Sequence, residues 1–223
     1  MKILMSWSSG KDSAWSLHTL NQQHPGAVAA LLTTYNDAVD RVAMHGVRRT
    51  VLEAQAAAAD LPLWQVPIPE QCTNEIYDAR MRETCARAMA DGFTHVAFGD
   101  LFLEDIRRYR EERLAGSGLT PLFPLWGIPT PELARQMIAG GLQATISVVD
   151  TRVLPAEFAG RSFDDALLRD LPAGVDPCAE NGEFHSCVTA GPMFRQPLAV
   201  TVGEHVDRPP FVFRDITLTG ADA

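Results

Sequence analysis

The sequence lacks long apolar runs, an excess of basic residues and paired cysteines, and each absence argues against a class of protein. No apolar run approaches the ~18–20 residues that a membrane span needs, so no membrane helix is expected. The formal net charge is −9 at pH 7, whereas a general nucleic-acid binder usually presents a basic face. The cysteines form no CxxC pair and no zinc-ligand spacing, which argues against a cysteine-based zinc site.

The N-terminal residues form a short strand-like run with a single lysine, which is unlike a signal peptide. Without a secretion signal, reduced cysteines and a cytoplasmic location are expected. The chain has 223 residues, of which 46% are hydrophobic and 21% charged, as in an ordinary globular protein of one large or two small domains.

Residues 8–13, Ser-Ser-Gly-Lys-Asp-Ser, lie where a predicted first strand (2–7) meets a predicted helix that includes 14–20. A tight loop of small residues before a helix leaves backbone N–H groups for a ligand, and the helix N-terminus favours an anion. Lys11 adds a mobile cation, and Asp12 can hold Mg²⁺ or cap the helix. The segment lacks the spacing of a Walker A loop and of GxGxxG, and a ligand-free strand–helix turn is the competing interpretation.

Strand-like and helix-like segments alternate in the first half of the chain. This alternation predicts an α/β fold with a parallel sheet, whose ligands gather beyond the carboxyl ends of the strands. The loop 8–13, the strand end at Thr33 and Thr34, and the loop at Gly99 and Asp100 all open on that edge, which predicts a nucleotide site. The predicted strands are 27–34, 63–67 and 94–98, and the predicted helices are 47–60, 74–91 and 104–114.

The amino-acid composition changes near residue 119, beyond which prolines become frequent. A helix at 131–139 and a strand at 144–149 are expected there, within an α+β region with long loops. We therefore predict two domains, a first over 1–118 that contains the predicted nucleotide site and a smaller C-terminal domain over 119–223, with a single continuous domain as the alternative.

Two further segments carry candidate side chains. The helix after Gly99 holds Arg108, Arg110 and Glu112, although a solvated helix with i,i+4 ion pairs explains the same pattern. Residues 176–186 place two carboxylates around a predicted turn, where they can bind a cation, position ammonia or accept a proton. That second group comprises Glu180, Asn181, Gly182 and Glu183, followed by His185, whose spacing fits neither a zincin nor a catalytic triad. His45 and Arg48, at the start of the second helix, give only a weak indication of phosphate binding.

The loop 8–13 resembles the PP-loop, Ser-Gly-Gly-x-Asp-Ser, of ATP pyrophosphatases, and the whole chain resembles the diphthine–ammonia ligase family. The family's Arg-x-Arg-x-Glu pattern matches Arg108, Arg110 and Glu112, and a Pro-Leu-Trp follows at 124–126. Residues 177–184 are similar to its Pro-Cys-Gly-Glu-Gly-Gly-Glu-aromatic signature, and residues 160–161 match a Gly-Arg pair.

The resemblance implies that residues 1–118 form an adenine-nucleotide α-hydrolase-like domain that binds ATP, and that residues 119–223 form a family-specific C-terminal domain that takes the acceptor substrate. It also implies ATP-dependent amidation with Mg²⁺. A carboxylate is adenylated, pyrophosphate leaves, and ammonia attacks the acyl adenylate. In eukaryotic and archaeal members the carboxylate belongs to a modified histidine of an elongation factor. The implied roles are phosphate binding by residues 8–13, catalysis by Lys11, Asp12, Glu180 and Glu183, and metal binding by Asp12.

Thr33, Thr34, Gly99 and Asp100 are expected to contact the nucleotide. The resemblance further implies that the acceptor is bound by Arg108, Arg110, Glu112, Glu180, Asn181, Gly182 and Glu183.

The chain departs from the family pattern at Ser9 and Ala179, which replace glycines, and at the pair 185–186, which is His-Ser where the ligases tend to have Glu-Thr. The chain looks closer to the family's bacterial relatives, which lack the diphthamide pathway. The expected acceptor is therefore a small molecule or a protein side chain other than diphthine, with diphthine itself as the alternative. A homo-oligomer is compatible with the sequence. A sulfur transferase acting on RNA and an ATP- or AMP-binding regulatory module remain the alternatives.

Overall fold

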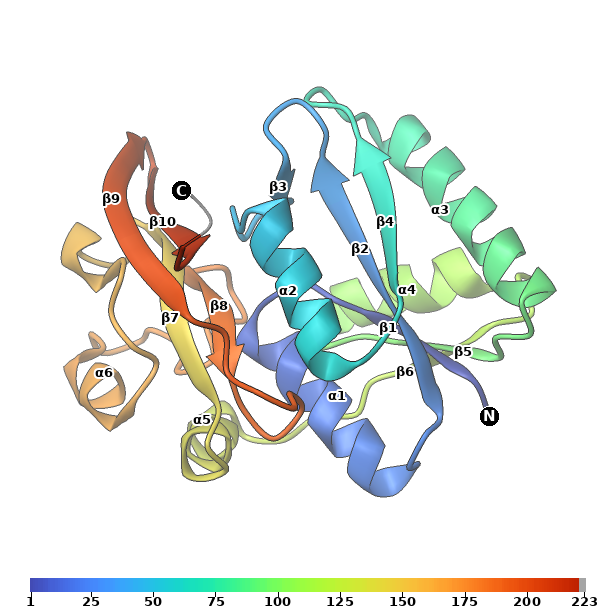
Figure 1. The fold of residues 1–223 in the computed structure, drawn as a ribbon, viewed down its shortest axis with the longest axis horizontal. Coiled ribbons are helices and arrows are strands. Elements are labelled where there is room, and N and C mark those ends of the chain that lie inside the picture. The colour runs from blue at the N-terminus through green and yellow to red at the C-terminus, as the bar shows by residue number, and fades with distance from the viewer. Residues whose placement is uncertain (221–223) are drawn as a thin grey trace.

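The computed structural model describes residues 1–220, which form two sheets with helices packed around them (Figure 1). The first sheet has six strands within this range, all parallel except β3. Together with a separate antiparallel sheet, this confirms the predicted fold class, a parallel-sheet α/β domain followed by a smaller α+β part. The strands of the first sheet are β1 (Ile3–Ser6), β2 (Val28–Asn36), β3 (Arg41–Val42), β4 (Leu63–Ile68), β5 (His95–Ala97) and β6 (Thr120–Leu122).

Helices cover both faces of the first sheet (Figure 1). Alternate residues of β1 point to opposite faces, so that Ile3 packs into one apolar cluster and Leu4 into another. The first cluster contains residues of α1 (Lys11–Gln23) and α2 (Arg49–Ala59). The second contains residues of α3 (Asn74–Ala90) and α4 (Glu104–Leu114). Burial on both faces explains why these strands have nearly continuous apolar sequences.

The strand order places β1 at the centre, between β2 and β5. The chain moves outward from β1 to β2 and β4, and later returns on the other side of β1 to form β5 and β6. The carboxyl ends of β1 and β5 therefore flank the point where the strand order reverses. Ligands of open α/β sheets bind at such points, so a ligand site is expected between the loops that follow β1 and β5.

The second sheet is antiparallel, in the order β8-β7-β10-β9. It is preceded by α5 (Thr130–Ala139), and a 3₁₀ turn, η1 (Ala156–Phe158), and α6 (Asp165–Asp170) lie in the connection after β7. Its strands are β7 (Gln143–Asp150), β8 (Phe184–Ala190), β9 (Val200–Arg208) and β10 (Phe211–Leu218).

The two sheets share one apolar core. A single cluster of buried side chains contains Leu17 of α1, Leu133 of α5 and Val149 of β7. An ion-pair group also joins the parts, because Arg41 and Arg48 both bind the Asp215 carboxylate of β10. Since β6 pairs with β5, we propose that the boundary between the two parts lies between β6 and α5, a few residues beyond the predicted division.

Among residues 1–220, no helix is long and apolar enough to cross a membrane. All four cysteines are free thiols, with Cys178 and Cys187 buried.

Candidate functional site

The loop between β1 and α1 is held by its own serine hydroxyls. Ser13 Oγ accepts the N–H of Ser8 at 3.3 Å and donates to the Gly10 carbonyl at 3.0 Å. The two serine hydroxyls lie 3.1 Å apart, and Ser8 Oγ accepts the N–H of Gly10 at 3.3 Å. These bonds turn the chain tightly from the strand into the helix, so the N-terminus of α1 opens beside the end of β1.

Two glycines allow other segments to approach this loop closely. A methyl group on Gly10 would lie 2.5 Å from the His45 ring, and one on Gly99 would lie 3.0 Å from the Ser13 nitrogen. The second clash is with backbone, which cannot rotate away as a side chain can. Glycine at position 99 therefore lets the loop after β5 lie directly against the first turn of α1.

Ser9 adopts a conformation that favours glycine. Its φ is +71°, in the left-handed region, and its side chain is 0% exposed. Its hydroxyl has no hydrogen-bond partner among the described residues, whereas its carbonyl accepts the N–H of Val188 at 3.0 Å. The backbone of Ser9 thus ties the loop to β8, while its side chain faces the interior of the protein.

Lys11 and Asp12 form the charged centre of the site. Lys11 is 3% exposed, and its Nζ lies 2.9 Å from Asp12 Oδ2 and also donates to the Cys178 carbonyl. Burial alone would lower the pKa of Lys11, but the nearby Asp12 carboxylate raises it above its usual value, so the ammonium stays charged. Its backbone N–H donates to Ser186 Oγ at 3.1 Å. The second sheet therefore contacts the first turn of α1 directly.

The loop 176–183, before β8, forms the opposite wall. Its Glu180 carboxylate accepts the N–H groups of Leu101 at 2.7 Å and Phe102 at 3.4 Å, from the loop after β5. Burial raises the pKa of Glu180 to about 7, and these N–H groups only partly oppose the shift. A carboxyl group with such a pKa can accept or donate a proton near neutrality.

Glu183 and Asn181 support this wall from within. Glu183 is 6% exposed, and its Oε1 accepts the N–H of Asp176 and the side-chain amide of Asn181, each at 3.1 Å. The segment 176–183 consists of turns and contains no strand residue. Ala179 has φ +55° within it, so both positions at which the chain replaces a family glycine have a left-handed backbone.

His45 and His185 form a ring pair in the cavity wall, with centroids 4.6 Å apart. Burial, the neighbouring His185 and Lys11 hold the pKa of His45 well below its usual value. Burial and Lys11 lower the pKa of His185 to about 4. Both rings are therefore neutral near pH 7 and present hydrogen-bonding nitrogens, not positive charge, to the cavity.

These segments enclose a cavity of about 250 Å³ at the carboxyl ends of β1 and β5. It brings together nine of the residues expected from the sequence: Ser8, Lys11, Asp12, Ser13, Gly99, Asp100, Arg110, Glu180 and Gly182. Its lining also includes residues to which the sequence assigned no site role or only a weak one: Ser6, His45, Phe98, Ala179, Phe184, His185 and Ser186.

Other predicted residues lie outside this cavity. Ser9, Asn181 and Glu183 support the two loops, and Gly10 is buried against His45. Thr33 is 2% exposed and donates its hydroxyl to the Trp7 carbonyl, and the Thr34 carbonyl accepts the N–H of Ala43.

The three residues of the Arg-x-Arg-x-Glu pattern separate in the structure. Arg108 is exposed on α4 and lines neither this cavity nor a larger one beside it. Glu112 lines the larger cavity, and Arg110 lines both. The competing interpretation of a solvated helix therefore describes Arg108 but not Arg110.

Comparison with known proteins gives two matches. Residues 130–214 match the sequence profile of a family described as the diphthamide synthase C-terminal domain. A diphthine–ammonia ligase of Schizosaccharomyces pombe is 27% identical over 226 residues, an alignment that covers 93% of this chain and 37% of the relative. The chain therefore spans little more than a third of the length of that curated relative.

Proposed function

We propose that this chain, which belongs to the diphthine–ammonia ligase family, is an ATP-dependent ligase that forms an amide from a carboxylate and ammonia. The supporting observation is the cavity at the carboxyl end of the sheet. It combines a buried, charged lysine at a helix N-terminus with the Glu180 carboxyl on a facing loop. The first feature suits a polyphosphate, and the second suits proton transfer to or from the attacking amine.

The reaction has two steps. A carboxylate oxygen of the acceptor attacks the α-phosphorus of ATP, and the bond from that phosphorus to the bridging oxygen breaks as pyrophosphate leaves. Ammonia then attacks the acyl carbon, AMP leaves, and the nitrogen loses a proton. The products are an amide, AMP and pyrophosphate.

Lys11 would bind the phosphates in the first step. An ammonium has three N–H donors, of which two are used by Asp12 and the Cys178 carbonyl. The third can be donated to a phosphate oxygen as negative charge develops on the departing pyrophosphate. This preorganised charge acts where water is largely excluded, which makes it effective in stabilising the transition state.

Asp12 fits a magnesium ligand. Its Oδ1 is buried and has no hydrogen-bond partner among the described residues, although its Oδ2 is paired with Lys11. Within residues 1–220 no group of three or more His, Cys, Asp or Glu side chains could hold a metal. Mg²⁺ is commonly held by one or two carboxylates together with substrate phosphates, so a single available carboxylate oxygen is sufficient. The ion would neutralise charge on the leaving pyrophosphate.

Glu180 would accept the proton that the attacking nitrogen loses in the second step. Its pKa of about 7 leaves a substantial unprotonated fraction at neutral pH while keeping it more basic than an ordinary carboxylate. Its two backbone N–H partners fix the position of the group. His185, with a pKa of about 4, is a weaker base than Glu180 and would serve as a hydrogen-bonding group.

The cysteines disfavour the sulfur-transfer alternative. Burial raises the pKa of the Cys178 and Cys187 thiols, which keeps them protonated and weakly nucleophilic. Neither Cys72 nor Cys85 lines the smaller cavity.

The test is ATP turnover with ¹⁵N-ammonium, scored by ³¹P NMR for AMP and pyrophosphate and by mass spectrometry for the labelled amide. One arm supplies a protein that bears diphthine, the acceptor in the name of the yeast relative, and the other supplies small carboxylic acids. Asp12→Asn should abolish turnover, whereas Asp170→Asn, which alters an exposed ion pair of α6, should not. ATP binding without AMP formation in both arms would favour the regulatory module.

A further inference from the structure

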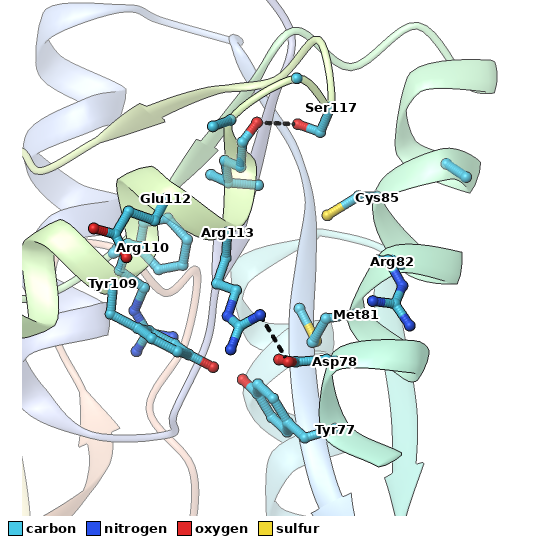
Figure 2. Close-up of a pocket in the computed structure, with 15 residues that line it drawn as sticks. Tyr77, Asp78, Met81, Arg82, Cys85, Tyr109, Arg110, Glu112, Arg113 and Ser117 are labelled. Carbon is cyan, nitrogen blue, oxygen red and sulfur yellow. Dashed lines mark hydrogen bonds and ion pairs between the residues drawn. The ribbon is translucent and has the colours of Figure 1, made fainter. Parts of the chain in front are cut away.

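A second, larger cavity adjoins the proposed reaction site. It has a volume of about 420 Å³ and lies between α3 and α4 (Figure 2), within the size range of small-molecule pockets. Phe98 and Arg110 line both cavities, so the two meet at a common wall. None of the residues 8–13 lines the larger one, which sets it apart from the predicted phosphate site.

The interior of the larger cavity is mainly apolar. Met81 and Cys85 come from α3, Leu114 comes from α4, and Phe98 follows β5. Burial raises the pKa of the Cys85 thiol, so this sulfur remains neutral and acts as part of the apolar lining. Such a surface suits an aliphatic or aromatic body and offers little to a highly charged ligand.

Polar groups gather at one end of the cavity. Asp78 and Arg113 form an ion pair there, in which Asp78 Oδ2 lies 2.8 Å from Arg113 Nη1. Figure 2 shows the hydroxyls of Tyr77 and Tyr109 pointing toward this ion pair. The charge of Arg113 is thus neutralised within the wall. Burial raises the pKa of Tyr77, with Arg110 opposing the shift, so the phenol remains a hydrogen-bond donor.

Arg110 is held less tightly than Arg113. Its Nε lies 3.4 Å from Asp100 Oδ2, a long contact, and its guanidinium lies over the Phe98 ring at 4.8 Å. Its side chain is 28% exposed, and it stands on the wall common to both cavities. An arginine fixed by stacking, with one weak ion pair, is well placed to receive a carboxylate.

We propose that the larger cavity binds the body of the acceptor, a small carboxylic acid with an apolar aliphatic or aromatic group, and that Arg110 holds its carboxylate at the border with the reaction cavity. This proposal rests on the proposed ligase function and names the substrate class of that site. Amidation removes the negative charge that Arg110 binds, so the neutral amide is held more weakly than the acid. The same arginine thereby favours both acceptor binding and product release.

The test uses protein labelled with ¹³C at the methionine methyl groups, since Met81 lines the larger cavity and Met137 is buried in the other apolar core. The probes are 3-phenylpropionate and its amide. The acid should shift the Met81 signal in a saturable way and leave Met137 unchanged. The amide should bind about tenfold more weakly, the loss expected for one charged hydrogen bond.

Three variants locate the binding. Arg110→Gln should weaken the acid about tenfold, whereas Arg80→Gln, an exposed arginine on α3 that lines neither cavity, should leave its affinity unchanged. Ala86→Trp adds bulk at the exposed rim of the larger cavity alone, and should abolish acid binding while ATP affinity is retained.

Two outcomes would overturn the proposal. One is an unshifted Met81 signal with wild-type protein that still binds ATP, which would leave the ligase function standing without this acceptor site. The other is equal affinity of the acid for wild type, Arg110→Gln and Ala86→Trp, which would place any binding elsewhere. A wild-type protein that does not bind ATP would instead count against the ligase function itself.

Discussion

Replacing Ser9 by glycine should stabilise the protein. The serine has φ +71°, a conformation that costs an L-residue about 1–2 kcal/mol. Its hydroxyl is buried with no hydrogen-bond partner among the described residues, which costs about 1–3 kcal/mol more. Glycine removes both of these costs. Its greater conformational entropy in the unfolded chain, however, disfavours folding by about 0.5–1 kcal/mol. The net expected gain is about 2 kcal/mol.

Thermal unfolding measures this gain. For a chain of this size, each kcal/mol corresponds to about 2–4 °C in Tm, so Ser9→Gly should raise Tm by about 4–8 °C. Ser9→Ala separates the two contributions, because it removes the unpaired hydroxyl and retains the strained backbone. Its Tm should lie between those of the wild type and Ser9→Gly.

Nucleotide binding supplies the second readout on the same variants. The Ser9 side chain is 0% exposed and does not line the smaller cavity, so ATP affinity should be unchanged. An unaltered or lowered Tm in Ser9→Gly would refute the assignment of strain. A large change in ATP affinity with unchanged stability would show instead that the hydroxyl contacts the ligand.

Three further perturbations test other parts of the site. A methyl at Gly99 would lie 3.0 Å from a backbone nitrogen of α1, so Gly99→Ala should cost about 1–3 kcal/mol in denaturant unfolding and weaken ATP binding; unchanged affinity by titration calorimetry would contradict this. The pKa of Glu180 is raised from 4.5 to about 7, so its contribution to stability falls as pH rises between these values. After allowance for its solvent exposure, Glu180→Gln should become about 1–2 kcal/mol more stable than wild type at pH 8 and equal to it near pH 4. A difference independent of pH would count against the shift. Gln55 is 0% exposed and accepts the indole N–H of Trp7, so Gln55→Leu should cost about 3 kcal/mol in urea unfolding, whereas Gln136→Leu on the surface of α5 should cost little. Equal losses in the two variants would show that burial at position 55 does not matter.

The alternation of strands and helices was predictable because buried parallel strands are continuously apolar and the helices between them are bounded by Gly and Pro. The short strands β3 and β6 were not predicted. Two or three residues carry no periodicity, and β6 contains Pro121, which lacks the N–H of a central-strand residue and is tolerated because β6 lies at the sheet edge.

The site was only partly predictable for a similar reason. The loop 8–13 has a local pattern, so its charged residues could be proposed as site residues from the sequence alone. The ring pair of His45 and His185 joins elements far apart in the sequence, and no local pattern reports it. Glu180 and Glu183 flank one turn and look equivalent in sequence, but only the packed structure places Glu180 in the cavity wall and Glu183 beneath it.

The central claim is that the N-terminus of α1 binds ATP, and titration calorimetry with ATP and Mg²⁺ tests it most directly. The account predicts saturable binding by the wild type, loss of that binding in Lys11→Ala and Asp12→Ala, and unchanged affinity in the surface variant Asp170→Ala. A folded wild type that does not bind ATP, or a Lys11→Ala variant that binds it as tightly, would contradict the account.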